Sequence, residues 1–207
     1  MRVLITAGPT REYIDTVRFL SNASSGRMGI ALAAAALDAD HDVTLLLGPV
    51  SPAPPAGVSV VPFVSCSDLA DALDQHFPDA DVLMMAAAVG DFRPERPYPS
   101  KLHRRNGPIT LRLYPTEDIL AGIATRKRAG QTIVSFSVED GSEDQVQAKA
   151  REEMLAKGAD FCVVNPPAAM AGGESEACVL GEDGIALPWR RRSKRDLAGE
   201  IIALLGK

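Results

Sequence analysis

Short apolar runs alternate with longer stretches of mixed polarity along most of this chain. Each apolar run is bounded by residues that favour turns, mainly Gly, Pro, Asp and Asn. Because the runs are short and contain few polar positions, they predict strands that are buried on both faces and therefore parallel. The predicted strands are Val3–Thr6, Val43–Leu47, Val58–Pro62, Val82–Ala86, Ile133–Ser137 and Phe161–Asn165.

The longer stretches have the apolar spacing of helices that bury one side. Ser67 precedes Asp68 and Ser142 precedes Glu143, which makes both serines candidates for helix N-caps. Strands that alternate with helices predict an α/β fold, a Rossmann-like, doubly wound and mostly parallel sheet. The predicted helices are Met28–Leu37, Ser67–His76, Ile119–Arg128, Glu143–Lys157 and Ser193–Leu205.

Two segments interrupt this alternation. Residues 90–115 contain several prolines and basic residues, followed by the alternating stretch Ile109–Leu113. They predict a flap that ends in an added strand. Residues 177–189 have the pattern of a β-hairpin whose turn lies at Glu182-Asp183-Gly184. We expect a single domain over residues 1–207, with the flap and the hairpin added to its sheet.

Composition narrows the class of protein. The chain has 207 residues, of which 46% are hydrophobic, and this is enough for one sizeable core. Its net charge of −5 argues against a non-specific nucleic-acid binder, which normally carries a basic surface. No run approaches the ~18 apolar residues that cross a bilayer, and the chain starts on a strand without a signal-peptide pattern. We therefore expect a cytoplasmic protein with no nucleic-acid or membrane partner.

The cysteines and histidines do not predict a metal centre. Cys66, Cys162 and Cys178 are far apart and lack the spacing of metal ligands, and the 3 histidines are scattered. Cys162 lies inside an apolar run, where a role in core packing is the more common one. We expect no zinc site and no Cys–His pair.

The richest group of polar residues lies between the first predicted strand and the first predicted helix. Free backbone N–H groups at a helix start, together with hydroxyls and a glycine, suit a phosphate or a carboxylate. Taken alone, Ser24 or Ser25 is explained equally well as a helix cap. The further polar residues of the same loop favour a ligand site. The loop contains Arg11, Asp15, Arg18 and Asn22, and it ends in Ser24-Ser25-Gly26.

Two further groups of residues suit anionic or metal-bound ligands. Asp91 follows the small residues at the end of a predicted strand, where it could hold a divalent cation or a hydroxyl, or form only an Asx-turn. The basic segment Lys101–Arg105 could neutralise the charge of a triphosphate, although such segments are most often solvated surface. Neither a Walker A motif nor a Gly-x-Gly-x-x-Gly motif is present.

Phe136 and Lys157 each have two interpretations. Phe136 ends a predicted strand and could stack on a base, although filling the core is the more common role of such a residue. Lys157 stands near the end of a predicted helix, where the helix dipole alone favours a cation.

The stretch Gly8–Gly29 resembles the signature loop of the phosphopantothenate–cysteine ligase family. The resemblance covers almost the whole chain and continues through Ala86–Pro94 and the basic segment to the last helix. Its later parts are Asp118-Ile119-Leu120-Ala121, Ser135-Phe136, Lys157–Asp160, Val163-Val164-Asn165 and Ser193-Lys194.

The resemblance implies a two-step ligation in coenzyme A biosynthesis. The carboxylate of 4′-phosphopantothenate would attack the α-phosphate of CTP and release pyrophosphate. The amine of L-cysteine would then attack the acyl-nucleotidylate and release CMP. A carboxylate is a poor electrophile, and the mixed anhydride gives it a good leaving group, so that positioning and charge stabilisation supply most of the catalysis.

Site roles follow from the resemblance, residue by residue. It implies that Asn22 holds the acyl-nucleotidylate and that Lys101 serves the activation step, as the catalytic residues. It implies substrate contacts from Arg18, Ser24, Ser25, Gly26 and Ala87. It implies nucleotide contacts from Asp91, Lys101, Thr116, Glu117, Asp118, Ile119, Phe136 and Lys157, with Asp91 also as a metal ligand.

Cofactor and partner expectations also come from the resemblance. It implies Mg²⁺ bound with the nucleotide, and a homodimer that pairs through Ile109–Leu113 and the neighbouring arm. The family's ligase is often fused behind a flavin-dependent decarboxylase. Met1 directly precedes the first ligase strand here, so we expect a stand-alone form without FMN and a separate decarboxylase.

The chain departs from the family pattern at three places. The usual Lys-x-Lys-Lys reads Lys101-Leu-His-Arg104, the first of two helix lysines is Glu153, and the usual Asn-Pro is Thr116-Glu117. Arg does not fully replace Lys where phosphate geometry matters. Because the carboxylate of Glu153 repels a triphosphate and Thr116-Glu117 leaves the base preference open, ATP in place of CTP stays an alternative. A second alternative is a module that binds nucleotide or phosphopantothenate without turnover. A dinucleotide-dependent reductase is disfavoured, because this chain lacks the glycine motif of such enzymes.

Overall fold

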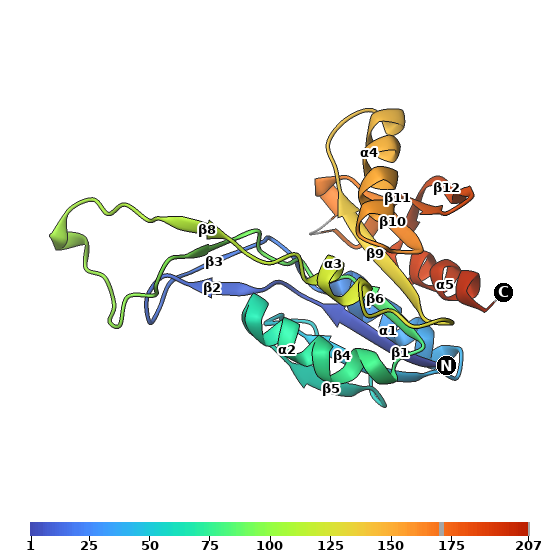
Figure 1. The fold of residues 1–207 in the computed structure, drawn as a ribbon, viewed down its shortest axis with the longest axis horizontal. Coiled ribbons are helices and arrows are strands. Elements are labelled where there is room, and N and C mark those ends of the chain that lie inside the picture. Colours follow the sequence, from blue (N-terminus) through green and yellow to red (C-terminus); the bar gives the residue numbers. More distant parts are fainter. Residues whose placement is uncertain (170–171, 207) are drawn as a thin grey trace.

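An eight-stranded sheet forms the centre of the computed structural model, which describes residues 1–169 and 172–206 (Figure 1). Its strand order is β12-β11-β10-β9-β6-β1-β4-β5. The six strands from β10 to β5 are parallel, and β11 and β12 form an antiparallel hairpin at one edge. The bounds are β1 Arg2–Ala7, β4 Asp42–Leu47, β5 Ser59–Pro62, β6 Val82–Met85, β9 Thr132–Val138, β10 Phe161–Asn165, β11 Glu174–Gly181 and β12 Gly184–Ser193. The predicted α/β fold with a mostly parallel sheet is confirmed.

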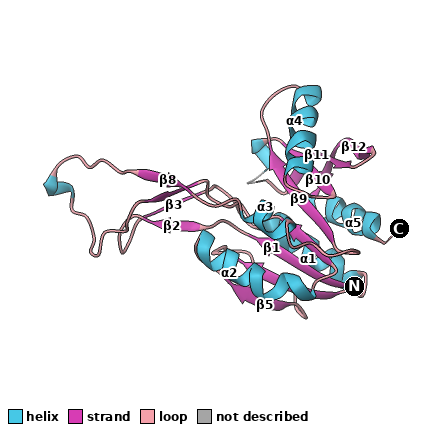
Figure 2. Cartoon of the chain, viewed as in Figure 1, coloured by secondary structure: helices cyan, strands magenta, loops and turns pink. Residues whose placement is uncertain are grey.

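Helices cover both faces of the sheet (Figure 2). Side chains alternate along β1, so that Leu4 joins the core under one set of helices and Ile5 joins the core under the other. On Leu4's side lie α2 (Cys66–His76), α3 (Ile119–Ala124) and α4 (Glu143–Ala156), and on Ile5's side lie α1 (Arg27–Asp38) and α5 (Lys194–Leu205). Short 3-10 turns occupy Phe77–Asp79, Arg104–Asn106 and Pro167–Ala169.

Two narrow ribbons project from the sheet as an arm, which we define as residues 11–21 and 92–115 (Figure 1). One ribbon pairs β2 (Arg11–Tyr13) with β3 (Phe19–Ser21), and the other pairs β7 (Phe92–Pro94) with β8 (Leu113–Pro115). The turn at Arg104–Asn106 lies at the far end of the arm, away from the sheet. The arm therefore carries the basic segment out of the body of the protein.

Several local predictions hold. The predicted hairpin exists as β11 and β12, which meet at Gly181 and Gly184. Ser142 caps α4 and takes part in a capping box with Gln145. Ser193, predicted as the first residue of the last helix, is instead its N-cap and accepts a hydrogen bond from the N–H of Asp196.

Other local predictions are wrong. The N-cap of α2 is Ser65, because Ser65 and Asp68 form the capping box and Ser67 lies inside the first turn. The strand predicted at Ile109–Leu113 lies at Leu113–Pro115 and pairs with β7, so it does not extend the central sheet. The strand predicted at Val58–Pro62 is a parallel edge strand that is mostly exposed, because β4 is its only neighbour among the described strands. The third predicted helix ends at Ala124.

Gly29 brings the first helix directly onto the first strand. A Cβ atom at this position would lie 2.4 Å from Cβ of Ala7 and 2.9 Å from the carbonyl oxygen of Thr6. Only glycine permits this approach. The contact fixes the start of α1, and therefore the end of the polar loop, against the carboxyl end of β1.

All three cysteines are buried free thiols. Burial raises the pKa of Cys66 and of Cys162 to about 11, and that of Cys178 to about 12. Thiols with such pKa values are almost fully protonated at neutral pH and are poor nucleophiles. Within the described helices, no stretch is both long and apolar enough to cross a membrane.

Candidate functional site

The candidate site lies where the sheet reverses its direction of growth. From β1 the chain moves outward to β4 and β5 and then returns to the other side of β1 as β6, followed by β9 and β10. The loops after β1 and β6 therefore separate at the carboxyl edge of the sheet. In open α/β sheets this is the position where ligands bind.

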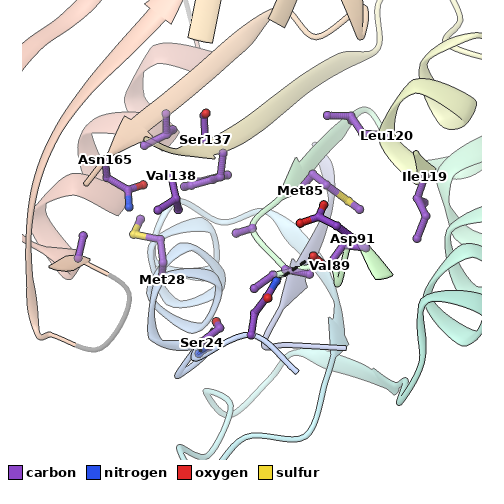
Figure 3. A pocket seen from close by; sticks show the side chains of 18 of the residues that line it. Ser24, Met28, Met85, Val89, Asp91, Ile119, Leu120, Ser137, Val138 and Asn165 are labelled. Atoms are coloured by element: carbon purple, nitrogen blue, oxygen red, sulfur yellow. Dashed lines mark hydrogen bonds between the residues drawn. The ribbon is translucent and has the colours of Figure 1, made fainter. Parts of the chain in front are cut away.

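A cavity of about 810 Å³ opens at this point, between α1, α3, α4, α5 and the ends of β6, β9 and β10. In Figure 3, Ser24 and Met28 at the start of α1 face Ser137 and Asn165 across the cavity, and Asp91 and Ile119 lie to one side. Most residues predicted for the site line this cavity. They are Asn22, Ser24, Ser25, Gly26, Ala87, Asp91, Thr116, Glu117, Asp118, Ile119, Phe136 and Lys157.

The N-terminus of α1 forms one wall of the cavity, and no side chain caps this helix end. Gly26 occupies the N-cap position with φ +72°, a left-handed conformation, and a Cβ there would lie 2.7 Å from Val50 Cγ1. The first turn contains no acidic residue. The hydroxyl of Ser24 accepts a long hydrogen bond, 3.4 Å, from the N–H of Gly26. The positive end of this helix therefore faces the cavity without a neutralising carboxylate of its own first turn.

The wall formed by the loop after β6 is tied to the polar loop and to the 115–118 turn. Asn22 Nδ2 donates to the carbonyl of Val89 at 2.9 Å. The hydroxyl of Thr116 donates to the carbonyl of Gly90 at 2.6 Å, and its N–H donates to the carbonyl of Asp91 at 2.9 Å. These bonds hold the amide of Asn22 and the backbone beside Asp91 in one place at the cavity edge.

The wall formed by α3 and α4 brings carboxylates close to Lys157. Asp118 caps α3 by accepting from the N–H of Ala121 at 3.0 Å, and its other oxygen lies 3.4 Å from Lys157 Nζ. Glu153, one turn before Lys157 on α4, lies 4.0 Å from the same nitrogen. The charge of Lys157 is therefore partly neutralised by these two half-exposed carboxylates. Phe136 is half-buried on the cavity wall and also packs against the core beneath α1 and α5.

Carboxylates outnumber cations around the cavity. The lining residues include Asp91, Glu117, Asp118, Glu139 and Glu153 against Arg27, Lys157 and Lys194. Such a lining binds a polyphosphate far better when a divalent cation neutralises part of the charge. The described part of the chain contains no group of three or more His, Cys, Asp or Glu side chains placed to hold a metal ion by themselves.

Two predicted site residues, Arg18 and Lys101, lie on the arm and not at the cavity of the same chain. Arg18 forms an ion pair with Asp15, whose side chain is fully buried. The N–H of Leu102 donates to Asp15 Oδ2 at 3.0 Å, and Arg18 donates to the carbonyl of Leu102 at 3.1 Å. The bond from Leu102, together with those from the N–H groups and guanidinium around Arg18, holds the pKa of Asp15 well below its usual range despite burial. Leu102, the residue after Lys101, is thus held through both its backbone N–H and its carbonyl.

A family model for the C-terminal domain of DNA/pantothenate metabolism flavoproteins matches residues 1–207. The chain belongs to this family. The family membership that the signature loop predicted is therefore confirmed.

Similar proteins and structures support the same family assignment. The coenzyme A biosynthesis bifunctional protein CoaBC of Mycobacterium tuberculosis (strain H37Rv) is 40% identical over 212 residues, which are 97% of this chain and 51% of that protein. The chain thus spans about half the length of this relative. The crystal structure of the C-terminal domain of a CoaBC protein superposes with a TM-score of 0.81 at 33% identity, over 99% of this chain and 93% of that one.

A third comparison shows the fold alone. The H337A mutant of Cab2, in complex with phosphopantothenate-cysteine, has a TM-score of 0.80 at 18% identity and covers 99% of this chain and 86% of its own.

Sequence reasoning about this family member missed several residues of the cavity. Arg27, Glu139, Asn165 and Lys194 line it, yet none was among the predicted site residues. Glu139 lies directly after β9 and accepts from Lys149 at 2.6 Å and from the hydroxyl of Ser137 at 3.1 Å. Glu139 directly follows the parallel strand β9, a position that often carries a ligand contact. Asn165, the last residue of β10, and Lys194 both belong to motifs of the family resemblance, which gave them no site role.

Proposed function

We propose that this chain catalyses the ligation of 4′-phosphopantothenate to L-cysteine through an acyl-nucleotidylate, with CTP as the nucleotide. The observation that carries this proposal is the position of the family's signature loop. Its Asn22, Ser24, Ser25 and Gly26 line one cavity together with the loop after β6 and the 115–118 turn. The name of the mycobacterial relative and the ligand in the Cab2 structure point to the same chemistry.

In the first step, an oxygen of the substrate carboxylate attacks the α-phosphorus of the nucleotide. A P–O bond forms, and the bond to the β-phosphate breaks with release of pyrophosphate. The open N-terminus of α1 suits the stabilisation of a phosphate, and Lys101 supplies a cation for the leaving pyrophosphate. A Mg²⁺ bound with the nucleotide would neutralise part of the phosphate charge, and the exposed carboxylate of Asp91 at the cavity edge is the residue that would hold it.

In the second step, the cysteine amine attacks the acyl carbon and CMP leaves, after which the amine loses a proton. The amide of Asn22 is oriented by its bond to Val89 at 2.9 Å, so its oxygen and second N–H stay available to the intermediate. Holding two reactants in this way supplies a large part of the rate enhancement in acyl transfer.

The nucleotide base fits the wall that contains the 115–118 turn, Phe136 and Lys157. Glu153 near Lys157 and Thr116-Glu117 in the turn leave ATP as the alternative nucleotide. A module that binds these ligands without turnover is the alternative from outside enzymology. The first experiment distinguishes all three.

We also propose that two copies of the chain pair through their arms and exchange Lys101. The arm exposes large apolar side chains over much of its length, and surfaces of this kind mark protein–protein contacts. The hydrogen bonds at Leu102 hold Lys101 away from the cavity of its own chain. At this position on the arm, Lys101 could reach the cavity of a second copy. The exposed apolar residues of the arm are Tyr13, Val17, Phe19, Phe92, Tyr98, Ile109 and Leu113.

The first experiment measures pyrophosphate release with 4′-phosphopantothenate and Mg²⁺, comparing CTP with ATP, with and without cysteine. Release that requires phosphopantothenate and is much faster with CTP supports the proposal. A preference for ATP identifies the alternative nucleotide. Ligand binding without any pyrophosphate release contradicts an enzymatic role and supports the binding module.

The second experiment mixes two variants that should each form little cysteine product alone, Asn22→Asp and Lys101→Gln, and measures product formation. If Lys101 acts in the partner's site, half of randomly formed dimers are mixed and one of their two sites is intact, so about a quarter of wild-type activity returns. If each chain uses its own Lys101, no activity returns. A monomeric mass at micromolar concentration would also contradict the exchange.

A further inference from the structure

Lys194 is a buried lysine without an anionic partner. It is the first residue of α5, its exposed fraction is 7%, and it lines the main cavity. Its backbone N–H donates to the carbonyl of Gly173 at 3.1 Å, which fixes its position. In residues 1–169 and 172–206, no carboxylate or carbonyl accepts a hydrogen bond from its ammonium group. A buried, unpaired charge is costly, so such a residue is rarely present for stability alone.

The surroundings of Lys194 increase the positive charge further. Burial, followed by repulsion from the guanidinium of Arg27, lowers the pKa of Lys194. Arg27 is the first residue of α1, and the positive end of that helix has neither a side-chain cap nor an acidic first turn. Two cations and the N-terminus of α1 thus lie at the same end of the cavity. No carboxylate from the first turn of α1 or α5 pairs with either cation.

The nearest acidic residue on α5 is otherwise engaged. Asp196 accepts from the hydroxyl of Ser193 at 2.7 Å and receives no bond from Lys194. The carboxylates of Glu117, Asp118 and Glu153 come from the turn before α3, from the N-cap of α3 and from α4, and these two helices cover the opposite face of the sheet. The cavity therefore has a cationic end between α1 and α5, and an acidic end next to α3 and α4.

We propose that Lys194 and Arg27, together with the N-terminus of α1, form a subsite for a dianionic phosphate group of a substrate. This rests on the proposed function, which supplies two phosphate-bearing candidates: the 4′-phosphate of phosphopantothenate and the terminal phosphates of the nucleotide. Each candidate is a phosphate with free oxygens, which can accept hydrogen bonds from two cations and from the backbone N–H groups of the helix start. Phosphate binding also neutralises the charge that burial makes costly at Lys194.

The test uses Lys194→Met, which removes the charge and keeps most of the apolar length of the side chain. The matched control is Arg195→Met on the next residue of α5, whose side chain is 87% exposed and lies outside the main cavity. Calorimetric titrations with 4′-phosphopantothenate, with CTP and with inorganic pyrophosphate are compared between the two variants and the wild type. Thermal unfolding of the ligand-free proteins is recorded alongside.

We expect Lys194→Met to weaken the binding of at least one ligand roughly 10-fold or more, and Arg195→Met to leave the affinity for all three unchanged. If the affinity for phosphopantothenate falls and the affinity for CTP is unchanged, the subsite binds the 4′-phosphate. If only the affinity for CTP falls, the subsite binds the phosphates of the nucleotide. The unfolding midpoint of Lys194→Met should equal or exceed that of the wild type, because an unpaired buried charge is removed. Unchanged affinity for all three ligands, or a lower midpoint without any loss of affinity, would overturn the proposal.

The pyrophosphate titration separates this proposal from the ligase proposal. If wild-type protein binds pyrophosphate through Lys194 but shows no turnover, the subsite exists and the ligase assignment fails. If ligation occurs with full affinity in Lys194→Met, the ligase assignment stands and the subsite is wrong.

Discussion

The backbone N–H of Leu102 donates a hydrogen bond of 3.0 Å to Oδ2 of Asp15, a residue 87 positions earlier in the chain. This bond joins the two ribbons of the arm, and a second link from the N–H of Tyr98 to the carbonyl of Ile14, 2.8 Å, lies nearby. Asp15 is therefore a positioning residue for the segment that carries Lys101. Its carboxylate also accepts from the N–H groups of Val17 and Arg18 at 2.8 and 2.7 Å.

Asp15→Asn should change how the stability of the protein depends on pH. The folded-state pKa of Asp15 lies below its ordinary value of 3.8, so its ionised form stabilises the fold fully above that value and this contribution is lost as the pH falls below it. The variant should be less stable than wild type at pH 7 and lose less stability between about pH 5 and pH 2. Urea unfolding at a series of pH values measures both effects. Asp74→Asn, at a half-exposed surface ion pair, is the control, and an unchanged acid slope in Asp15→Asn would contradict the assignment.

Gly29→Ala should destabilise the fold by about 2 kcal/mol, because the added methyl group meets Ala7 and the Thr6 carbonyl within a packed layer. Gly199→Ala on α5 is the matched control, since no atom lies within 4 Å of its added Cβ. That variant should gain about 0.5–1 kcal/mol from helix propensity. Denaturant unfolding of both variants measures the difference, and equal stabilities would disprove the close contact between α1 and β1.

Arg192→Met should cost about 3 kcal/mol of stability, because the carbonyl of Ala177, whose bond to Arg192 is buried, and two carbonyls with part-buried bonds lose this donor. The side chain of Arg192 is 2% exposed and donates to the carbonyls of Ala177, Arg190 and Pro188 at 2.9, 3.0 and 3.1 Å. It also pairs with Glu200 at 3.0 Å, which joins the hairpin to α5.

The control for this prediction is the neighbouring Arg191. Its side chain is 76% exposed and pairs with Glu174 at 2.7 Å, so Arg191→Met should cost less than about 1 kcal/mol. Thermal or urea unfolding of the two variants ranks them directly. A larger loss in Arg191→Met would show that burial does not decide the contribution of these arginines.

Asn22→Asp should separate the two chemical steps of the proposed ligation. A carboxylate cannot donate to the carbonyl of Val89, and it places a negative charge beside the intermediate. Pyrophosphate release in the first turnover should continue, whereas formation of the cysteine product should fall at least roughly 10-fold. Rapid-quench measurements of both products test this. An equal loss in both steps would argue against a specific role in holding the intermediate.

Glu153→Gln should improve nucleotide binding. Removing this charge leaves Asp118 as the remaining carboxylate partner of Lys157 among the described residues, and lowers the repulsion of the triphosphate. Because Glu153 is 43% exposed, screening limits the gain, and we expect the KM for CTP to fall roughly 2- to 5-fold. Glu152→Gln, an exposed neighbour outside the cavity, is the control. An unchanged KM for both nucleotides would place the triphosphate away from α4.

Local sequence patterns predicted the strands of the parallel part of the sheet and the helices, and the family resemblance supplied most of its site residues at the cavity. Apolar runs such as Val3–Thr6 and Phe161–Asn165 lie in buried parallel strands, because a strand covered on both faces requires an unbroken apolar run. The signature loop ends at the helix start where Ser24 and Gly26 line the cavity, because a strand–loop–helix unit places that loop at the carboxyl edge of the sheet.

Boundaries set by individual hydrogen bonds were not predictable in the same way. Ser65 and Ser67 are equally good caps by composition, and only the reciprocal bonds with Asp68 choose Ser65. The strand at Leu113–Pro115 depends on a partner, Phe92–Pro94, that no local pattern identifies.

The sequence by itself determined the fold class, the family and the strand–loop–helix unit that bears the signature residues, because these depend on local periodicity and on a contiguous motif. Only the tertiary structure decided that Arg18 and Lys101 lie on an arm clamped at Asp15 and not at the cavity of the same chain. Only the tertiary structure also showed that Lys194 is buried opposite the start of α1 without an anionic partner among the described residues. The physical reason is that burial and charge pairing depend on residues far apart in sequence, which the topology of the sheet brings together.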